Sequence, residues 1–127
     1  MNESVSTLMT RRVCAVDMDD TVSQVEELLA REGLTWAPVL EDQRLVVGVI
    51  SAADLLQFHA QRRDPLGVPA WQLCTYKPIT VDQGTPLVQV ARAMVEQGIH
   101  HVVVTNRDSI VGVVSSLDFV RAFVDGR

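Results

Sequence analysis

The chain has 127 residues, which is the length of one ordinary domain and enough to bury a hydrophobic core without disulfides. Hydrophobic residues make up 47% of it, a share that is typical of globular proteins and excludes a disordered chain. The net charge of −5 argues against a nucleic-acid partner, because contacts to phosphates require basic patches.

The sequence also predicts a compartment. Cys14 and Cys74 form no CxxC pair, and the first ten residues lack the apolar segment of a secretory signal. We therefore interpret both cysteines as reduced thiols and predict a cytoplasmic location. No apolar run approaches the 18 residues of a membrane span, so we expect no membrane partner.

The first half of the chain predicts a helix, two strands and a second helix. A cap at Asp20 or Thr21 is followed by apolar residues at helical spacing, and Gly33 is expected to end that helix. Ser51 is expected to cap the second helix, because it stands between a Val-rich strand and a helical pattern. The expected elements are a helix to about Glu32, strands over 36–40 and 45–51, and a helix over 52–62.

The segment from Arg63 to Pro78 contains three prolines and Gly67, which predict an irregular connection with at most one helical turn over 70–74. The same four elements then follow again. Thr85 is expected to cap a helix that starts at Pro86 and ends at Gly98. The remaining elements are expected to be strands over 101–105 and 109–115 and a helix over 116–125.

The two halves are copies of each other. The signature Gly48–Asp54 (GVISAAD) returns 64 residues later as Gly112–Asp118 (GVVSSLD), and upstream matches such as Val16 with Val81 are 65 residues apart. The single lost residue falls in a turn, where length changes are tolerated. A repeat of this length in a short chain indicates one unit used twice.

This repeat predicts a mixed α/β (α+β) fold of two helix–strand–strand–helix units with pseudo-twofold symmetry. The expected organisation is a first repeat over 1–62, a linker and lead-in strand over 63–78, and a second repeat over 79–127.

Each signature places a hydroxyl and a carboxylate at a strand-to-helix junction. Ser51 with Asp54, and Ser115 with Asp118, have the chemistry to hold a ribose-phosphate, because helix amides attract anions and a carboxylate accepts bonds from vicinal hydroxyls. The alternative is structural: a Ser-x-x-Asp sequence that opens a helix is close to a capping box. The sequence leaves both interpretations open.

At this point the chain resembles the CBS domain pair, or Bateman module. The resemblance rests on the doubled Gly-x-x-Ser-x-x-Asp signature, on the lead-in Ser6–Thr10 (STLMT) and on Trp36–Val39 (WAPV), and it covers nearly the whole chain. It implies a tandem CBS repeat whose two clefts bind AMP, ADP, ATP or another adenosyl ligand. It also implies regulation by conformational shift, homodimerisation through helices and an effector protein that the sequence does not identify.

Carried over residue by residue, the resemblance implies two sites. In each site the Asp of one repeat holds the ribose, while lead-in and strand residues of the other repeat surround the base. The first site would combine Ser51 and Asp54 with Ile79, Thr80, Ile99, His100 and His101. The second would combine Val113, Ser115 and Asp118 with Cys14, Ala15, Leu34, Thr35 and Trp36.

Several of these residues have a second interpretation. His100 and His101 either contact a phosphate or simply open a strand, and Trp36 either stacks on adenine or belongs to the core. His59, alone on a helix, is expected at the surface. Leu117, Val120 and Phe123 form a stripe that is expected in the core more often than in an interface.

The competing function is a dimerising protein-interaction module that binds no nucleotide. Catalysis is not expected, because the sequence has no nucleophile–base pair, glycine-rich phosphate loop or metal-ligand spacing. We therefore predict no catalytic cofactor and no protein-bound metal, with the adenine nucleotide as regulatory ligand. Whether Mg²⁺ accompanies a triphosphate is left open.

Overall fold

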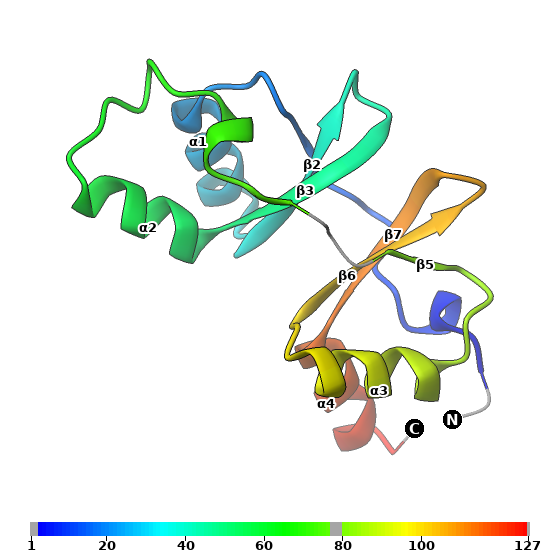
Figure 1. The fold of residues 1–127 in the computed structure, drawn as a ribbon. Helices are drawn as coiled ribbons and strands as arrows, with labels where there is room; N and C mark the ends of the chain where they lie inside the picture. Colours follow the sequence, from blue (N-terminus) through cyan, green and yellow to red (C-terminus); the bar gives the residue numbers. More distant parts are fainter. Residues whose placement is uncertain (1–2, 77–79, 127) are drawn as a thin grey trace. The chain divides into compact units, whose positions relative to one another are not determined.

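The computed structural model describes residues 3–76 and 80–126. The chain forms two compact units (Figure 1). The first-repeat unit comprises Cys14–Pro78, and the second-repeat unit comprises Met1–Val13 together with Ile79–Arg127.

The first-repeat unit has a sheet in the order β1-β2-β3-β4, in which β1 is parallel to β2 and the other pairs are antiparallel. Val25 and Leu29 of the first helix pack with Ile50 of the sheet and with Phe58 of the second helix to form its core. The elements are β1 (Val16–Asp17), α1 (Val22–Glu32), β2 (Trp36–Glu41), β3 (Leu45–Ser51), α2 (Ala52–Ala60), the 3-10 turn η2 (Ala70–Gln72) and β4 (Thr75–Tyr76).

The second-repeat unit has a sheet in the order β5-β6-β7, with one parallel and one antiparallel pair. Its core joins Val90 and Met94 of a helix to Val104 and Val114 of the sheet and to Phe119. The elements are the 3-10 turn η1 (Val5–Thr7), β5 (Thr80–Asp82), α3 (Leu87–Gln97), β6 (His101–Asn106), β7 (Ser109–Ser115) and α4 (Ser116–Val124).

The N-terminal segment belongs to the second-repeat unit, although it precedes the first repeat in sequence. The Val5 N–H donates to the Thr85 carbonyl at 2.7 Å, and Thr10 exchanges two backbone hydrogen bonds with Val113, at 2.8 and 3.0 Å. Residues 65–76 play the equivalent part within the first-repeat unit, where the Val22 N–H donates to the Val68 carbonyl at 2.8 Å. The compact units therefore do not follow the order of the repeats along the chain.

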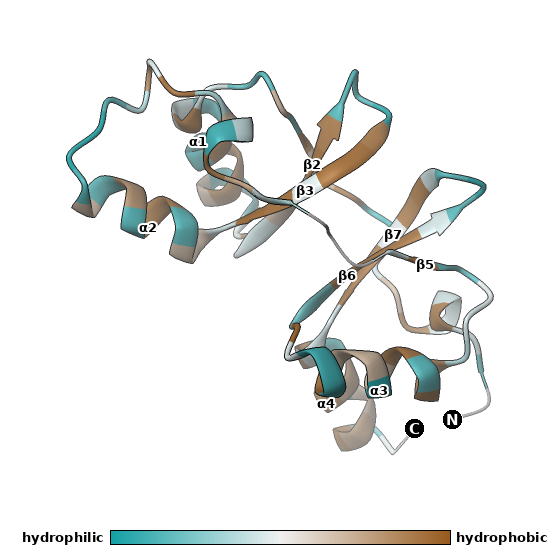
Figure 2. Ribbon diagram, viewed as in Figure 1, coloured by the Kyte–Doolittle hydropathy of each residue, from teal (hydrophilic) through white to brown (hydrophobic). Residues whose placement is uncertain are grey.

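The two predicted helix–strand–strand–helix units are confirmed, and both central strand pairs lie within one residue of their predicted bounds. Figure 2 shows that the strands of these pairs are largely hydrophobic. Gly33 and Gly98 end their helices with φ of 65° and 63°, a left-handed conformation that glycine adopts without strain.

The connection contains a helical turn at Ala70–Gln72 and a strand at Thr75–Tyr76 that pairs with β3, as the sequence led us to expect. Two expectations need correction. The cap of α3 is Pro86, which makes no side-chain capping bond, so the predicted Thr85 cap is wrong. The stripe on α4 is not core: in this chain Leu117 is 52%, Val120 51% and Phe123 57% exposed, and the buried residues of α4 are Phe119 and Ala122.

Candidate functional site

The first signature forms a complete capping box at the start of α2. The Asp54 N–H donates to Ser51 Oγ at 3.2 Å, while the Ser51 N–H donates back to Asp54 Oδ2 at 2.8 Å. Ser51 Oγ also donates to the same carboxylate oxygen, at 3.0 Å. The two side chains are therefore fixed relative to each other, and both are half-buried.

The second signature repeats this geometry at the start of α4. The Asp118 N–H donates to Ser115 Oγ at 3.4 Å, and the Ser115 N–H and Oγ donate to Asp118 Oδ2 at 2.7 and 3.2 Å. The backbone of Ser115 has φ −121° and ψ 165°, against −122° and 164° for Ser51. The structural interpretation of the motif is thus correct in both repeats.

Capping does not use up the carboxylates. Among the residues that the structure describes, Oδ1 of Asp54 and Oδ1 of Asp118 accept no hydrogen bond, and an ionised carboxylate has about four acceptor positions. Each aspartate is therefore oriented through Oδ2 and retains Oδ1 for a ligand. A pair of vicinal hydroxyls can donate hydrogen bonds to such an oxygen.

The helix termini offer less to an anion than the sequence suggests. The first amide of α2, on Ala52, donates to the Thr35 carbonyl at 2.8 Å, and the third, on Asp54, donates to the Ser51 cap. The first amide of α4, on Ser116, donates to the His100 carbonyl at 3.0 Å in the same way. Two of the first three amides in each helix are therefore already bonded, which limits phosphate binding there.

In the first-repeat unit, the predicted base-contact residues lie beside the signature. Trp36 opens β2 and pairs in register with Ser51, and it is half-buried rather than a core residue. Thr35 is exposed, whereas Leu34 packs against the core. The unit thus brings Thr35 and Trp36 to the end of the sheet where Asp54 begins its helix.

In the second-repeat unit, histidines occupy the equivalent place. His101 opens β6 in register with Ser115, and His100 precedes it, exposed. Burial lowers the pKa of His101 below its ordinary 6.5, and the neighbouring His100 lowers it further. His101 is therefore mainly neutral at pH 7.

The other predicted residues are less suited to ligand contact. Both backbone groups of Val113 are bonded to Thr10, so only its half-buried side chain remains for a ligand. Ile99 packs against the core, while Thr80 is exposed at the start of β5. Cys14 and Ala15 are half-buried just before β1, and the predicted contact at Ile79 lies outside the described residues.

Sequence reasoning missed the role of Thr10. Its pairing with Val113 occupies the place that Thr75 and β4 take beside Val49 in the other unit. The 65-residue spacing of Thr10 and Thr75 was the available signal.

The described residues hold no group of three or more His, Cys, Asp or Glu side chains placed to bind a metal ion. They also contain no helix with the length and apolar character needed to cross a membrane.

Comparison with protein families gives two matches. The CBS domain model matches residues 5–60 and again residues 70–125. An uncharacterized protein of Methanocaldococcus jannaschii is 25% identical over 95% of this chain, and an uncharacterized 17.7 kDa protein of Acidianus ambivalens is 25% identical over 98% of it. The chain covers 32% of the former protein and 76% of the latter, and it spans less than half of two further Methanocaldococcus jannaschii relatives.

Solved structures share the fold. CBSX2 of Arabidopsis thaliana has a TM-score of 0.85 at 26% identity, over 98% of this chain and 96% of that one. A complex of CBSX2 with AMP has a TM-score of 0.81 at 27% identity, over 97% of both chains. The CBS domain pair of protein MJ0100, in complex with 5′-methylthioadenosine and S-adenosyl-L-methionine, has a TM-score of 0.88 at 20% identity, over the full length of both chains.

Proposed function

Because this chain belongs to the CBS domain family, we propose that it is a regulatory module that binds an adenosine-containing ligand. The observation that carries the proposal is the duplicated Ser–Asp pair, in which each carboxylate is oriented through Oδ2 while Oδ1 accepts no bond from the described residues. The complex of CBSX2 with AMP supports this ligand class.

In this proposal Asp54 and Asp118 accept hydrogen bonds from ribose hydroxyls, and Trp36, His100 and His101 contact other parts of the ligand, grouped into two sites as the family resemblance implies. Trp36 is half-buried, and its ring is the predicted partner for stacking on adenine. His101 contributes as a neutral donor, and His100 is exposed for phosphate contact. Which residues of the other repeat complete each set is a prediction of the family resemblance alone.

The remaining assignments extend this proposal. We place the module in the cytoplasm, acting as a homodimer on an effector protein through a ligand-induced shift of conformational populations. The role is binding rather than catalysis, and the ligand is regulatory.

The test compares ligand-induced thermal shifts in matched variants. AMP, ADP, ATP, NAD and S-adenosylmethionine are each added at millimolar concentration, because binding to the native state raises Tm by mass action. Asp54→Ala and Asp118→Ala remove the carboxylates, whereas Ser51→Ala and Ser115→Ala remove the capping hydroxyls and keep the carboxylates and the backbone bonds to them. Loss of the shift in an aspartate variant but not in its serine control supports the proposal. No shift with any compound contradicts it.

One observation favours a second function, a dimerising interaction module without a nucleotide. Leu117, Val120 and Val124 recur at helical spacing on α4 and are 52%, 51% and 81% exposed in the single chain. Analytical sedimentation of the wild type and of Val120→Lys measures the oligomeric state. A wild-type dimer that becomes a monomer in the variant supports an interface on α4. A dimer together with the absence of any thermal shift would favour this function over nucleotide binding.

A further inference from the structure

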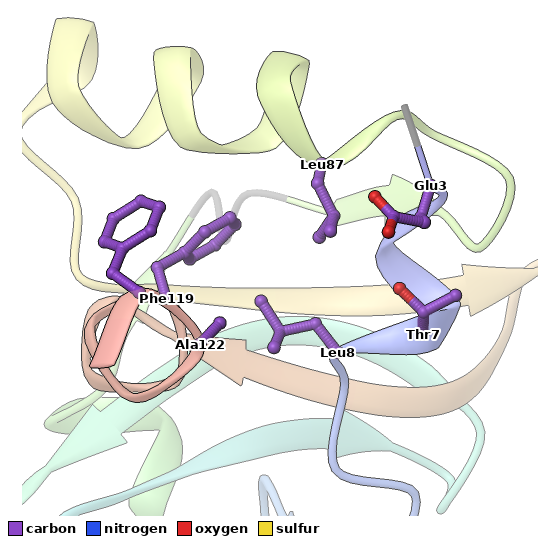
Figure 3. Close-up of a pocket in the computed structure, with 7 residues that line it drawn as sticks. Glu3, Thr7, Leu8, Leu87, Phe119 and Ala122 are labelled. Atoms are coloured by element: carbon purple, nitrogen blue, oxygen red, sulfur yellow. The ribbon is translucent and has the colours of Figure 1, made fainter. Parts of the chain in front are cut away.

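The outer side of α4 carries an apolar stripe. Figure 3 shows Phe119 and Ala122 on the side of α4 that faces a pocket of about 210 Å³ within the second-repeat unit. Leu117, Val120 and Val124 recur at helical spacing on the opposite side of the helix, and all three are exposed. The stripe therefore points away from the core of its own unit.

The neighbouring helix adds to this apolar surface. Val88 and Val95 of α3 stand seven residues apart, so they lie on one side of that helix, and both are exposed. Helices α3 and α4 are in contact within the unit. Exposed apolar side chains gathered on packed helices mark an interaction site more often than chance exposure. The exposed large hydrophobic side chains of the two helices are Val88, Val95, Leu117, Val120, Phe123 and Val124.

The same positions in the first repeat are mostly polar or small. Among the residues of α1 and α2, all of which the structure describes, Leu56 is the one exposed large hydrophobic side chain. Because the two repeats share a backbone plan, the fold itself does not require an apolar surface at these positions. The six equivalents in the first repeat are Ser23, Ala30, Ala53, Leu56, His59 and Ala60.

The seam between the two helices differs in the same sense. In the first-repeat unit, His59 Nε2 and Glu26 Oε1 are joined by a hydrogen bond that links α2 to α1. The equivalents in the second repeat are Phe123 and Ala91, which cannot form such a bond. The first repeat thus closes its outer surface with a polar pair, whereas the second repeat leaves an exposed phenyl ring there.

The charges of α3 and α4 are suited to a second copy of the same surface. The two helices carry Arg92 and Arg121 against Glu96 and Asp118, so their charges balance. In a twofold contact the same patch meets itself, and each arginine can approach a carboxylate of the other copy. The chain as a whole has a net charge of −5, which opposes contact between copies over most other surfaces.

The helices of the first repeat lack this balance. Helices α1 and α2 carry Glu26, Glu27, Glu32 and Asp54 against Arg31, so carboxylates are in excess. Two copies of that surface would repel each other, and they would bury little apolar area in return. A second copy therefore fits the helices of the second repeat and not those of the first.

We propose that two copies of the chain associate about a twofold axis through α3 and α4 of the second-repeat unit, with Val120 of each copy near the same residue of the other. The proposed contact is confined to the helices of one repeat, whereas the family resemblance implies dimerisation through helices without assigning them. The inference specifies the homodimer of the proposed function and rests on that assembly, but it does not depend on the ligand.

The first test compares equivalent positions of the two repeats by analytical sedimentation of the full chain. Val120→Lys should raise the dissociation constant of the dimer about a hundredfold or more, because two ammonium groups would be buried facing each other. Leu56→Lys, its matched control on α2, should change that constant by less than about threefold. Circular dichroism reports folding, and Val124→Lys takes the place of Val120→Lys if the latter does not fold.

The outcomes separate this inference from the homodimer itself. A wild-type dimer that survives Val120→Lys, or that Leu56→Lys weakens equally, would overturn the contact through the second repeat and leave the homodimer standing. A wild-type monomer would overturn both and would assign the apolar surface to a different protein.

The second test examines the twofold symmetry. Val120→Glu alone should weaken the dimer as Val120→Lys does, since two carboxylates would meet at the axis. An equimolar mixture of the two variants should recover the dimer, because a lysine of one copy then faces a glutamate of the other. A mixture that stays monomeric would overturn the pairing of α4 with its own copy.

Discussion

The first and second repeats share a backbone plan but fill it with different side chains. Helices α2 and α4 are both nine residues long and begin with the same capping box, and the strand pairs have the same register shift at Val39 and at Val104. Their cores differ most at Phe58 and Ala122. The duplicated backbone features are those that the fold requires, and the divergent side chains mark places where one repeat has acquired space or charge of its own.

The largest expected effect is in the first repeat. Phe58→Ala removes a completely buried ring and should lower the free energy of unfolding by about 3–5 kcal/mol, since the loss of buried surface adds to the cost of the cavity. Both tryptophans, Trp36 and Trp71, belong to the first-repeat unit, so urea unfolding followed by their fluorescence reports that unit.

The matched control is Leu56→Ala on the same helix, because Leu56 is 74% exposed and should change stability by less than about 0.5 kcal/mol. A loss below about 1 kcal/mol for Phe58→Ala would contradict the packing of α2.

The next largest difference in stability between the repeats is expected at the signature glycines, Gly48 and Gly112. A Cβ on Gly48 would lie 2.6 Å from the Thr75 carbonyl oxygen, whereas on Gly112 it would lie 2.6 Å from Met9 Sδ and 3.0 Å from the Thr10 carbonyl oxygen. A methionine side chain moves aside more easily than a backbone strand. Gly48→Ala should therefore cost about 1–3 kcal/mol and Gly112→Ala less.

Urea midpoints followed by far-UV circular dichroism, which reports both units, measure this difference. A larger loss for Gly112→Ala would mean that the Met9 side chain is held more firmly than the Thr75 backbone, contrary to the comparison of the two strands.

The helix caps give a smaller difference, and one that the sequence alone predicts incorrectly. Thr21 accepts the Gln24 N–H at 3.2 Å in a full capping box, so Thr21→Ala should cost about 1 kcal/mol. Thr85 caps nothing, because Pro86 is the cap of α3, and Thr85→Ala should stay within about 0.5 kcal/mol. Thermal unfolding of the two variants tests this, and equal losses would restore the predicted Thr85 cap.

The sequence predicted what local chemistry determines. Hydrophobic periodicity and the stop signals at Gly33 and Gly98 were sufficient for the helices and central strands, because each signal acts within a few residues. The capping geometry of Ser51 and Asp54 was also visible, since it depends on residues three apart.

The sequence did not reveal what depends on distant segments. The pairing of Thr10 with Val113 joins residues about a hundred positions apart, and no local pattern encodes it. A pocket of about 210 Å³ that Leu8, Leu87 and Ala122 help to line was not predictable for a similar reason, because Ala122 looks like any small helical residue until its neighbours near η1 and in α3 are known. The exposed stripe on α4 shows that apolar spacing alone does not say which side of a helix faces the core.

The smallest expected effect distinguishes the two sheet ends by pH. His101 stands where the first repeat has Trp36, and burial, with a further contribution from His100, lowers its pKa below 6.5. Between the lowered folded pKa and 6.5 the unfolded chain binds more protons than the folded one, so this contribution to stability is complete above pH 6.5 and is lost as pH falls through the folded pKa.

His101→Asn should therefore have a shallower decline of urea midpoint between pH 7 and pH 5 than the wild type. His100→Asn removes the lesser cause and should reduce the decline only slightly. If the His101→Asn profile runs parallel to the wild-type profile, the acid sensitivity arises elsewhere, and the neutral-donor role proposed for His101 in phosphate binding loses its physical basis.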